Sequence, residues 1–141
     1  MKGMVQVYTG NGKGKTTAAL GLTLRAAGAG LKIFFAQFIK CGNTSELQSI
    51  ARLGDYIEVH QYGREGFIRG NPDKSDISLA KQGLTQCATA IGQGRFDIVV
   101  MDEVITAVYL NMLELKDLLA IISSRPASVE IVMTGRNAPA E

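Results

Sequence analysis

The chain has 141 residues, which is the length of one ordinary domain and enough to bury a core without disulfides or structural metals. Hydrophobic residues make up 46% and charged residues 20% of it, a globular composition that excludes a disordered or collagen-like protein. The formal net charge is only +2 and no run of about 18 apolar residues occurs, so nothing favours nucleic acid or a membrane as a partner.

The predicted elements alternate between strands and helices along the chain. Short segments rich in β-branched or aromatic residues predict strands at 5–8, 33–38, 57–60, 98–101 and 129–133. Helical spacing predicts helices at 15–29, 46–53 and 77–93, and over 104–122 in one or two pieces. We expect Gly30 and Gly94 to end helices, and Ser45 with Gln48 to form a capping box.

This alternation predicts an α/β fold, a single wound parallel-sheet domain that spans residues 1–141. Several predicted strands are continuous apolar runs, as is typical of strands covered by helices on both faces. Ligands of such sheets collect at the carboxyl ends of the strands, so functional residues should follow strands. The stretch 62–76 contains three glycines and a proline and reads as a long loop, a kind of segment that is often functional.

The first predicted strand runs directly into a glycine-rich segment that opens the first predicted helix. Its residues are Thr9, Gly10, Asn11, Gly12, Lys13, Gly14, Lys15, Thr16 and Thr17. Apart from Thr9, which replaces the first glycine, they match the phosphate-binding pattern G-x-x-x-x-G-K-[ST]. Backbone N–H groups, the helix N-terminus and Lys15 would bind the triphosphate of ATP, and Thr16 would bind Mg²⁺. The alternative is a glycine-rich turn before a helix that happens to begin Lys-Thr-Thr.

A second candidate site, which is acidic, follows the apolar strand predicted at 98–101. Asp102 and Glu103 come directly after it, an arrangement by which phosphate-loop proteins hold magnesium or orient a nucleophile. Asp102 is the better candidate for a metal ligand. The alternative is a helix N-terminus at which acidic residues offset the helix dipole.

Three further residues are candidates of a weaker kind. Arg136 follows the last predicted strand and would contact phosphate or ribose, or else lie exposed on a surface turn. Glu46 lies in a first helical turn, where a glutamate usually only supports the helix. Phe67 in the long loop would cover a flat ligand, or else join a small apolar cluster under the loop. His60 is given no role.

The cysteines and the N-terminal sequence give information on the cellular compartment of the protein. Cys41 and Cys87 are far apart and neither belongs to a Cys-x-x-Cys pair, so a disulfide framework or zinc knuckle is not expected. The N-terminus lacks a basic stretch followed by an apolar segment. We therefore predict a cytoplasmic protein.

Four stretches together resemble a known family. They are residues 9–17, Gln37-Phe38-Ile39-Lys40, residues 97–103, and residues 125–139 with their Thr-Gly-Arg-Asn-Ala-Pro ending. In this combination the chain resembles the ATP:corrinoid adenosyltransferases of the BtuR/CobO type, and Thr9 is itself part of that family's phosphate loop.

The resemblance implies a RecA-like, P-loop NTPase-like domain, usually a homodimer, in which ATP lies across the loop in the reverse of the common direction. A corrinoid reduced to Co(I), with a flavoprotein-type reductant as partner, would attack the ribose C5′ and release triphosphate. Lys13, Lys15 and Mg²⁺ on Thr16 and Asp102 would neutralise the departing triphosphate. Glu103 would complete the metal or ribose environment, and the loop of Phe67 would cover the lower face of the corrin.

The resemblance also has a limit. Relatives generally continue past the segment that ends at Glu141, so we expect this chain to be shorter at its C-terminus, whether as a truncated enzyme, a minimal enzyme or an impaired homologue. Two other functions stay open: a small kinase or ATPase that uses the loop in its ordinary orientation, and a non-catalytic ATP-binding module.

Overall fold

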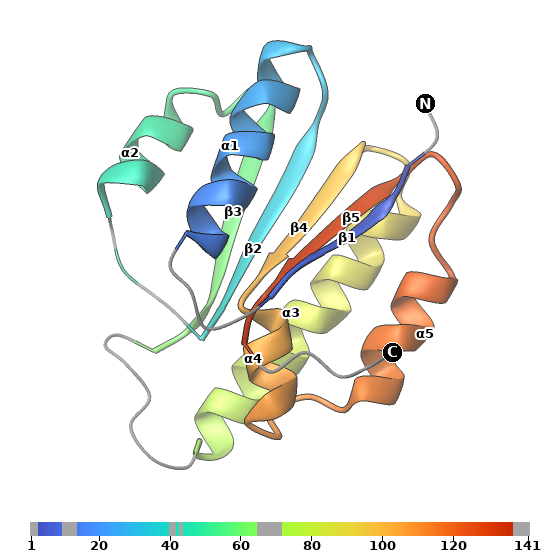
Figure 1. The fold of residues 1–141 in the computed structure, drawn as a ribbon. Helices are drawn as coiled ribbons and strands as arrows, with labels where there is room; N and C mark the ends of the chain where they lie inside the picture. The colour runs from blue at the N-terminus through green and yellow to red at the C-terminus, as the bar shows by residue number, and fades with distance from the viewer. Residues whose placement is uncertain (1–2, 10–13, 40–41, 43, 65–71, 137–141) are drawn as a thin grey trace.

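The computed structural model describes residues 3–9, 14–39, 42, 44–64 and 72–136, and its elements alternate as the sequence predicts. In chain order these are β1 (Val5–Tyr8), α1 (Lys15–Gly28), β2 (Ile33–Ile39), α2 (Ser45–Ala51), β3 (Ile57–Gly63), α3 (Lys74–Gly92), β4 (Ile98–Asp102), α4 (Val104–Tyr109), α5 (Leu115–Ser123) and β5 (Glu130–Thr134). The predicted α/β fold class is therefore confirmed (Figure 1).

The five described strands form one sheet in the order β1-β5-β4-β2-β3, and every pairing between them is parallel. All carboxyl ends therefore meet at one edge, at the bottom of Figure 1. We call it the carboxyl edge. Among the described strands β1 pairs only with β5, and its Val5 and Val7 are 37% and 46% exposed.

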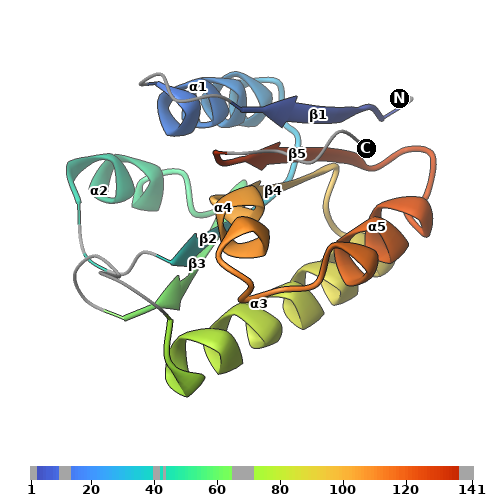
Figure 2. The same cartoon turned by 60° about the horizontal axis from the view of Figure 1, so that its bottom comes forward.

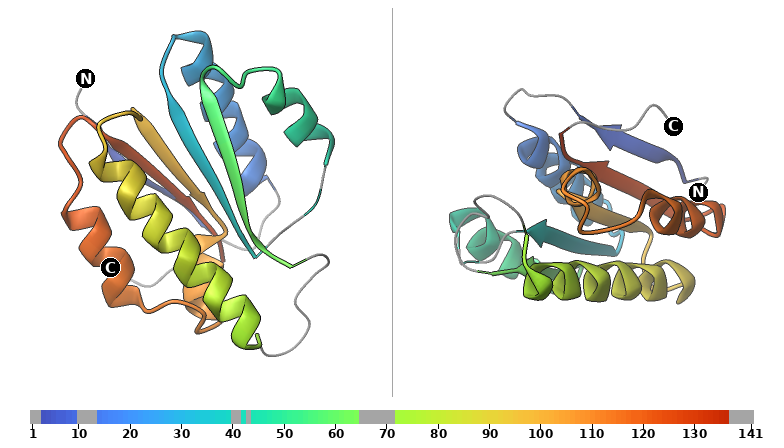
Figure 3. Two further views of the ribbon diagram at one scale, coloured as in Figure 1. Left: turned by 180° about the vertical axis from the view of Figure 1, so that it is seen from behind. Right: turned by 90° about the horizontal axis from the view of Figure 1, so that it is seen from below.

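Helices cover both faces of the sheet, which gives three layers. On one face α1 and α2 bury Ala19 and Ile50 against alternate strand residues such as Ile33 and Phe35. On the other face α3, α4 and α5 pack against the intervening residues, such as Phe34. Figure 2 shows α1 and α3 on opposite sides of the sheet, and the left view of Figure 3 shows α3 lying along its back. This explains the continuous apolar runs, because both faces of each central strand are buried.

Two local predictions about helix ends have different outcomes. Gly30 and Gly94 have φ angles of +84° and +75°, the left-handed conformation that ends a helix, as expected. The capping box expected at Ser45 and Gln48 is wrong, because α2 already begins at Ser45 and its N-cap Thr44 makes no side-chain bond. The capping box lies instead at the start of α3, between Asp73 and Asp76.

The region predicted as one or two helices is two. Asn111 has a φ of +61°, and the Met112 N–H donates to the Ala107 carbonyl, which closes the end of α4. Asparagine adopts this left-handed conformation more readily than other residues with a side chain. In the described part of the chain, no helix is both long and apolar enough to cross a lipid bilayer.

Candidate functional site

The described part of the phosphate loop lies between β1 and α1 at the carboxyl edge. Gly14 has a φ of +99°, which favours glycine, and its carbonyl accepts the first helical hydrogen bond from Ala18. Lys15, Thr16 and Thr17 then form the first turn of α1, with Lys15 and Thr16 partly buried. Of the other predicted loop residues Thr9 is exposed, and 10–13 lie outside the described residues.

Thr16 and Asp102, the two predicted metal ligands, are in direct contact. The Thr16 hydroxyl donates to Asp102, with Oγ1 2.9 Å from Oδ1 and 3.2 Å from Oδ2. Asp102 is fully buried at the end of β4. A buried carboxylate needs hydrogen-bond donors, and the Thr134 hydroxyl supplies a second one at 2.6 Å from Oδ1. The fold therefore brings together residues that are 86 positions apart in the chain.

Glu103 follows Asp102 in an unusual backbone conformation. Its φ of +64° is rare for a residue with a side chain and costs about 1–2 kcal/mol. The Glu103 N–H donates to the Thr134 hydroxyl at 2.8 Å, so the same threonine holds both acidic residues. Glu103 is the N-cap of α4 but makes no side-chain cap bond, so capping does not explain its carboxylate.

The segment after β5 packs against α4. Gly135 has a φ of +146°, and a Cβ placed there would lie 2.5 Å from the Thr106 backbone nitrogen. Only glycine fits this close approach. The Arg136 N–H donates to Thr106 Oγ1 at 3.0 Å, while Arg136 itself is exposed at the carboxyl edge.

The remaining candidates are less closely grouped. Glu46 lies in the first turn of α2, exposed, on the helix that follows β2. Phe67 lies outside the described residues. His60 stacks on Phe34, with 4.9 Å between ring centroids, and its Nε2 lies 2.9 Å from Glu58, which fits the absence of an assigned role. Burial raises the pKa of the Cys87 thiol, which keeps it protonated and unreactive.

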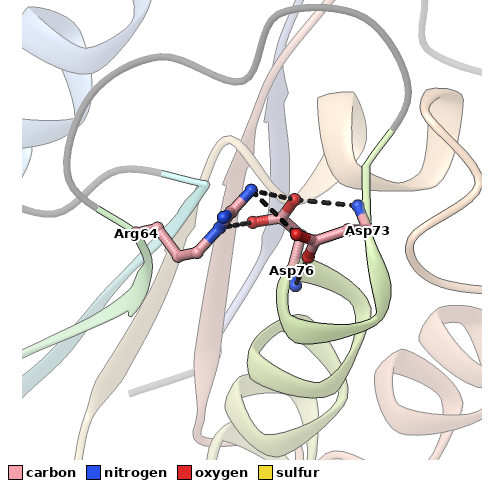
Figure 4. Close-up of polar contacts among 3 residues, drawn as sticks. All are labelled: Arg64, Asp73 and Asp76. Carbon is pink, nitrogen blue, oxygen red and sulfur yellow. Dashed lines mark hydrogen bonds and ion pairs between the residues drawn. The ribbon is translucent and has the colours of Figure 1, made fainter.

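An ion pair joins the end of β3 to the start of α3 (Figure 4). Arg64 donates to the buried carboxylate of Asp76 through Nε at 2.7 Å and a second nitrogen at 3.0 Å. Asp73 lies 3.2 Å from Arg64 and shares the capping box with Asp76. The bond from Arg64 is the main cause that holds the pKa of Asp76 below its usual range.

Sequence reasoning missed three polar residues at the carboxyl edge. Thr134 bonds to the Asp102 carboxylate at the end of β4 and to the backbone N–H of Glu103 that follows it. Gln37 and Gln61 bond to each other, with Nε2 of Gln61 2.9 Å from Oε1 of Gln37. A signal was present for Gln37, because it is the one polar residue in the otherwise apolar strand Ile33–Ile39.

The fold and this edge define the class of the protein. A parallel sheet whose first strand leads to Gly-Lys-Thr at a helix start, with an aspartate at the end of another strand, is typical of P-loop nucleotide-binding domains. The chain also matches the model of the family described as "ATP:corrinoid adenosyltransferase BtuR/CobO/CobP" over residues 1–141. It belongs to this family.

Curated proteins of the family are similar over nearly the whole chain. A corrinoid adenosyltransferase of Pseudomonas aeruginosa is 37% identical over 139 residues, covering 97% of this chain and 68% of that protein. Corrinoid adenosyltransferases of Escherichia coli K12 and Salmonella typhimurium are each 30% identical over 140 residues, covering 96% of this chain and 68% of theirs. The chain thus corresponds to about two thirds of the length of these enzymes.

Proposed function

We propose that this protein transfers the 5′-deoxyadenosyl group of ATP to the Co(I) ion of a reduced corrinoid, of the cobalamin or cobyrinic acid diamide class, and releases triphosphate. The observation that supports this proposal most strongly is the family match over residues 1–141. The contact between Thr16 and Asp102 at the carboxyl edge supports it, because the two residues expected to act together lie together.

The chemistry needs little proton transfer. The electron pair of Co(I) forms the Co–C5′ bond as the C5′–O bond breaks, and cobalt is formally oxidised to Co(III). The triphosphate leaves with the electrons of the broken bond. Because the nucleophile carries no proton and the leaving group is a polyanion, the protein needs no general base and acts by positioning and electrostatic stabilisation.

Each site residue has a proposed part in this reaction. Residues 9–17 bind the triphosphate, with the ammonium groups of Lys13 and Lys15 opposing the charge that develops on the leaving group. Glu103 would complete the metal or ribose environment, and Arg136 would bind phosphate or ribose. Glu46 and Phe67 would lie on the corrinoid side.

Mg²⁺ fits the oxygen donors at this edge. Magnesium is usually held by one or two carboxylates together with substrate phosphates, and Asp102 with the Thr16 hydroxyl is such a set. Bound there, Mg²⁺ would neutralise phosphate charge. The bond from the Thr16 hydroxyl to Asp102 would keep both proposed ligands close together.

We further propose that residues 1–141 form one domain, that two chains form a homodimer in the cytoplasm, and that a flavoprotein-type reductant supplies the electrons for Co(I). The family resemblance supports these proposals. The single domain has additional support from the one continuous sheet to which all described strands belong.

The test is an anaerobic incubation of the protein with ATP, Mg²⁺ and chemically reduced cob(I)alamin. The corrinoid spectrum reports adenosylation, and chromatography identifies the nucleotide and phosphate products. We expect adenosylcobalamin and triphosphate in equal amounts, and neither with Lys15→Ala. ADP or AMP as products would replace the proposal with phosphoryl transfer, and unchanged ATP bound to the protein would indicate a binding module.

A further inference from the structure

A row of polar side chains crosses the sheet at the carboxyl edge beside Asp102. Gln61 of β3 is the cross-strand partner of Gln37 in β2, and Gln37 is the cross-strand partner of Asp102 in β4. Thr134 of β5 continues the row through its bond to Asp102. We call these four residues the polar row. They extend on the face covered by α1, because Ile33 and Phe35 precede Gln37 on the same side of β2.

Gln37 is only 4% exposed, so its amide is costly to bury unless it is hydrogen-bonded. Ile33 and Phe35 come before Gln37 on the same face of β2 and are both buried, so a third apolar residue would be expected at position 37. Packing alone therefore does not account for an amide at this position. A buried polar side chain beside a ligand site indicates a role in that site.

The orientation of both amides follows from the backbone of Gly42. The Gly42 N–H can only donate and lies 3.1 Å from Oε1 of Gln61, while its carbonyl can only accept and lies 3.0 Å from Nε2 of Gln61. Nε2 of Gln61 is thus a donor, and it also donates to Gln37 at 2.9 Å. The acceptor of this bond must be the Oε1 atom of Gln37. The NH₂ group of Gln37 is then available to donate to other acceptors.

We propose that Gln37 is a binding residue for the triphosphate of the nucleotide and that Gln61 is the positioning residue that fixes its amide. The cross-strand partner of Gln37 on the side away from Gln61 is Asp102, where phosphate oxygens gather in the function proposed above, on which this inference rests. An NH₂ donor next to a carboxylate offsets the repulsion between that carboxylate and phosphate without adding a charge. Gln61 acts only through Gln37 and through the Gly42 backbone.

The first variant is Gln37→Glu, which keeps the shape and the acceptor for Gln61 but removes the NH₂ donor. Calorimetric titration with MgATP, without corrinoid, should show affinity weakened by roughly tenfold or more. The KM for cob(I)alamin should change by less than about twofold, because the proposed role of this amide is in binding the triphosphate and not the corrinoid. Gln82→Glu is the matched control: it makes the same charge change at an exposed position of α3, on the opposite face of the sheet.

The second variant, Gln61→Met, keeps the length of the side chain and adds no charge beside Asp102. It should weaken MgATP binding by less than Gln37→Glu does, and the double variant should lose less than the product of the two single losses. That non-additivity is the readout that a merely structural role for Gln61 would not produce. Thermal melting of each variant confirms that the titrated protein is folded.

Two results would overturn the inference: MgATP affinity within about twofold of wild type in folded Gln37→Glu, or fully additive losses in the double variant. The proposed function fails separately, when wild type binds MgATP but forms no adenosylcobalamin. In that case weakened MgATP binding by Gln37→Glu would still support the role of the amide in binding phosphate.

Discussion

At the level of single residues, the proposed site depends most on Asp102. Its carboxylate is fully buried and receives two hydroxyl donors, from Thr16 on α1 and from Thr134 on β5. It therefore fixes the start of α1 relative to the ends of β4 and β5. In the proposed function the same carboxylate would hold Mg²⁺.

Asp102→Asn should reduce adenosyltransferase activity by roughly 10²–10³-fold, because it removes the negative charge that would hold Mg²⁺ against the triphosphate. Steady-state assays at saturating ATP measure this loss. The control is Asp97→Asn just before the other end of β4, where the Asp97 carboxylate accepts a bond from the Lys32 N–H. That variant should keep activity within about twofold. Equal losses in both variants would contradict a specific role for Asp102.

Gly135→Ala tests the close approach between the end of β5 and α4. A Cβ there would lie 2.5 Å from the Thr106 backbone and force a strained φ of +146°, so we expect a loss of about 2–4 kcal/mol in the free energy of unfolding. Gly92→Ala is the matched control, because a Cβ at Gly92 meets nothing within 4 Å. It should be neutral or stabilising by up to about 1 kcal/mol. Urea unfolding measures the free energy of unfolding of both variants, and equal values would contradict the close approach at Gly135.

At the scale of elements, the start of α3 is held by more than its capping box. Asp76 caps the helix through the Asp73 N–H and also accepts two bonds from Arg64 at the end of β3. The ion pair thus ties together the two ends of a segment that the sequence predicts to be functional. Half of the Arg64 side chain is exposed, so most of the effect should come from the buried carboxylate.

Asp76→Asn should lower the free energy of unfolding at neutral pH by about 1–2 kcal/mol, through loss of cap and ion-pair bonds. The pKa of Asp76 lies below its ordinary value of 3.8, so its contribution is present above that pH and is lost as pH falls through the lowered pKa. The difference between wild type and variant should therefore shrink below about pH 4. Asp117→Asn in the first turn of α5 is the control for the loss of an acidic residue at a helix start, and it should lower the free energy of unfolding at neutral pH by less than Asp76→Asn does.

Most elements of the fold could be predicted from the sequence, because their signals are local. The apolar run of β2 and the end of α1 at Gly30 are examples. The capping box was misplaced because Ser45 and Asp73 have equally good cap chemistry in sequence. The box fails at Ser45 because α2 begins at Ser45 itself, with Thr44 as its N-cap, whereas α3 begins directly after Asp73.

The site was predictable only in part, for the same reason. Thr16 and Asp102 were expected together because phosphate-loop proteins hold magnesium with the loop threonine and an aspartate at the end of a second strand, and the structure brings the two into contact. Thr134 and Gln61 were missed, since their roles depend on which strands are neighbours. The order β1-β5-β4-β2-β3 puts Thr134 beside Asp102 and Gln61 beside Gln37, and no local pattern encodes that order.

At the scale of the whole molecule, ligand binding should stabilise the fold by mass action. MgATP at 100 times its dissociation constant should add about 2.7 kcal/mol to the free energy of unfolding, if it binds only the native state. Thermal melting with and without MgATP measures the shift. Thr16→Val should abolish most of it, whereas an equal shift in that variant would exclude the Thr16 end of α1 as part of the site.

If the protein is an adenosyltransferase, the C5′ carbon of ATP becomes bonded to cobalt, and an isotope label on that carbon shows where it goes. Wild-type protein would be incubated anaerobically with Mg²⁺, cob(I)alamin and ATP labelled with ¹³C at C5′, and the corrinoid would be purified and analysed by NMR and mass spectrometry. The account predicts the label in a cobalt-bound CH₂ group, one per corrinoid, with unlabelled triphosphate as the other product. Label that stays in ADP, AMP or intact ATP, with an unalkylated corrinoid, would contradict it.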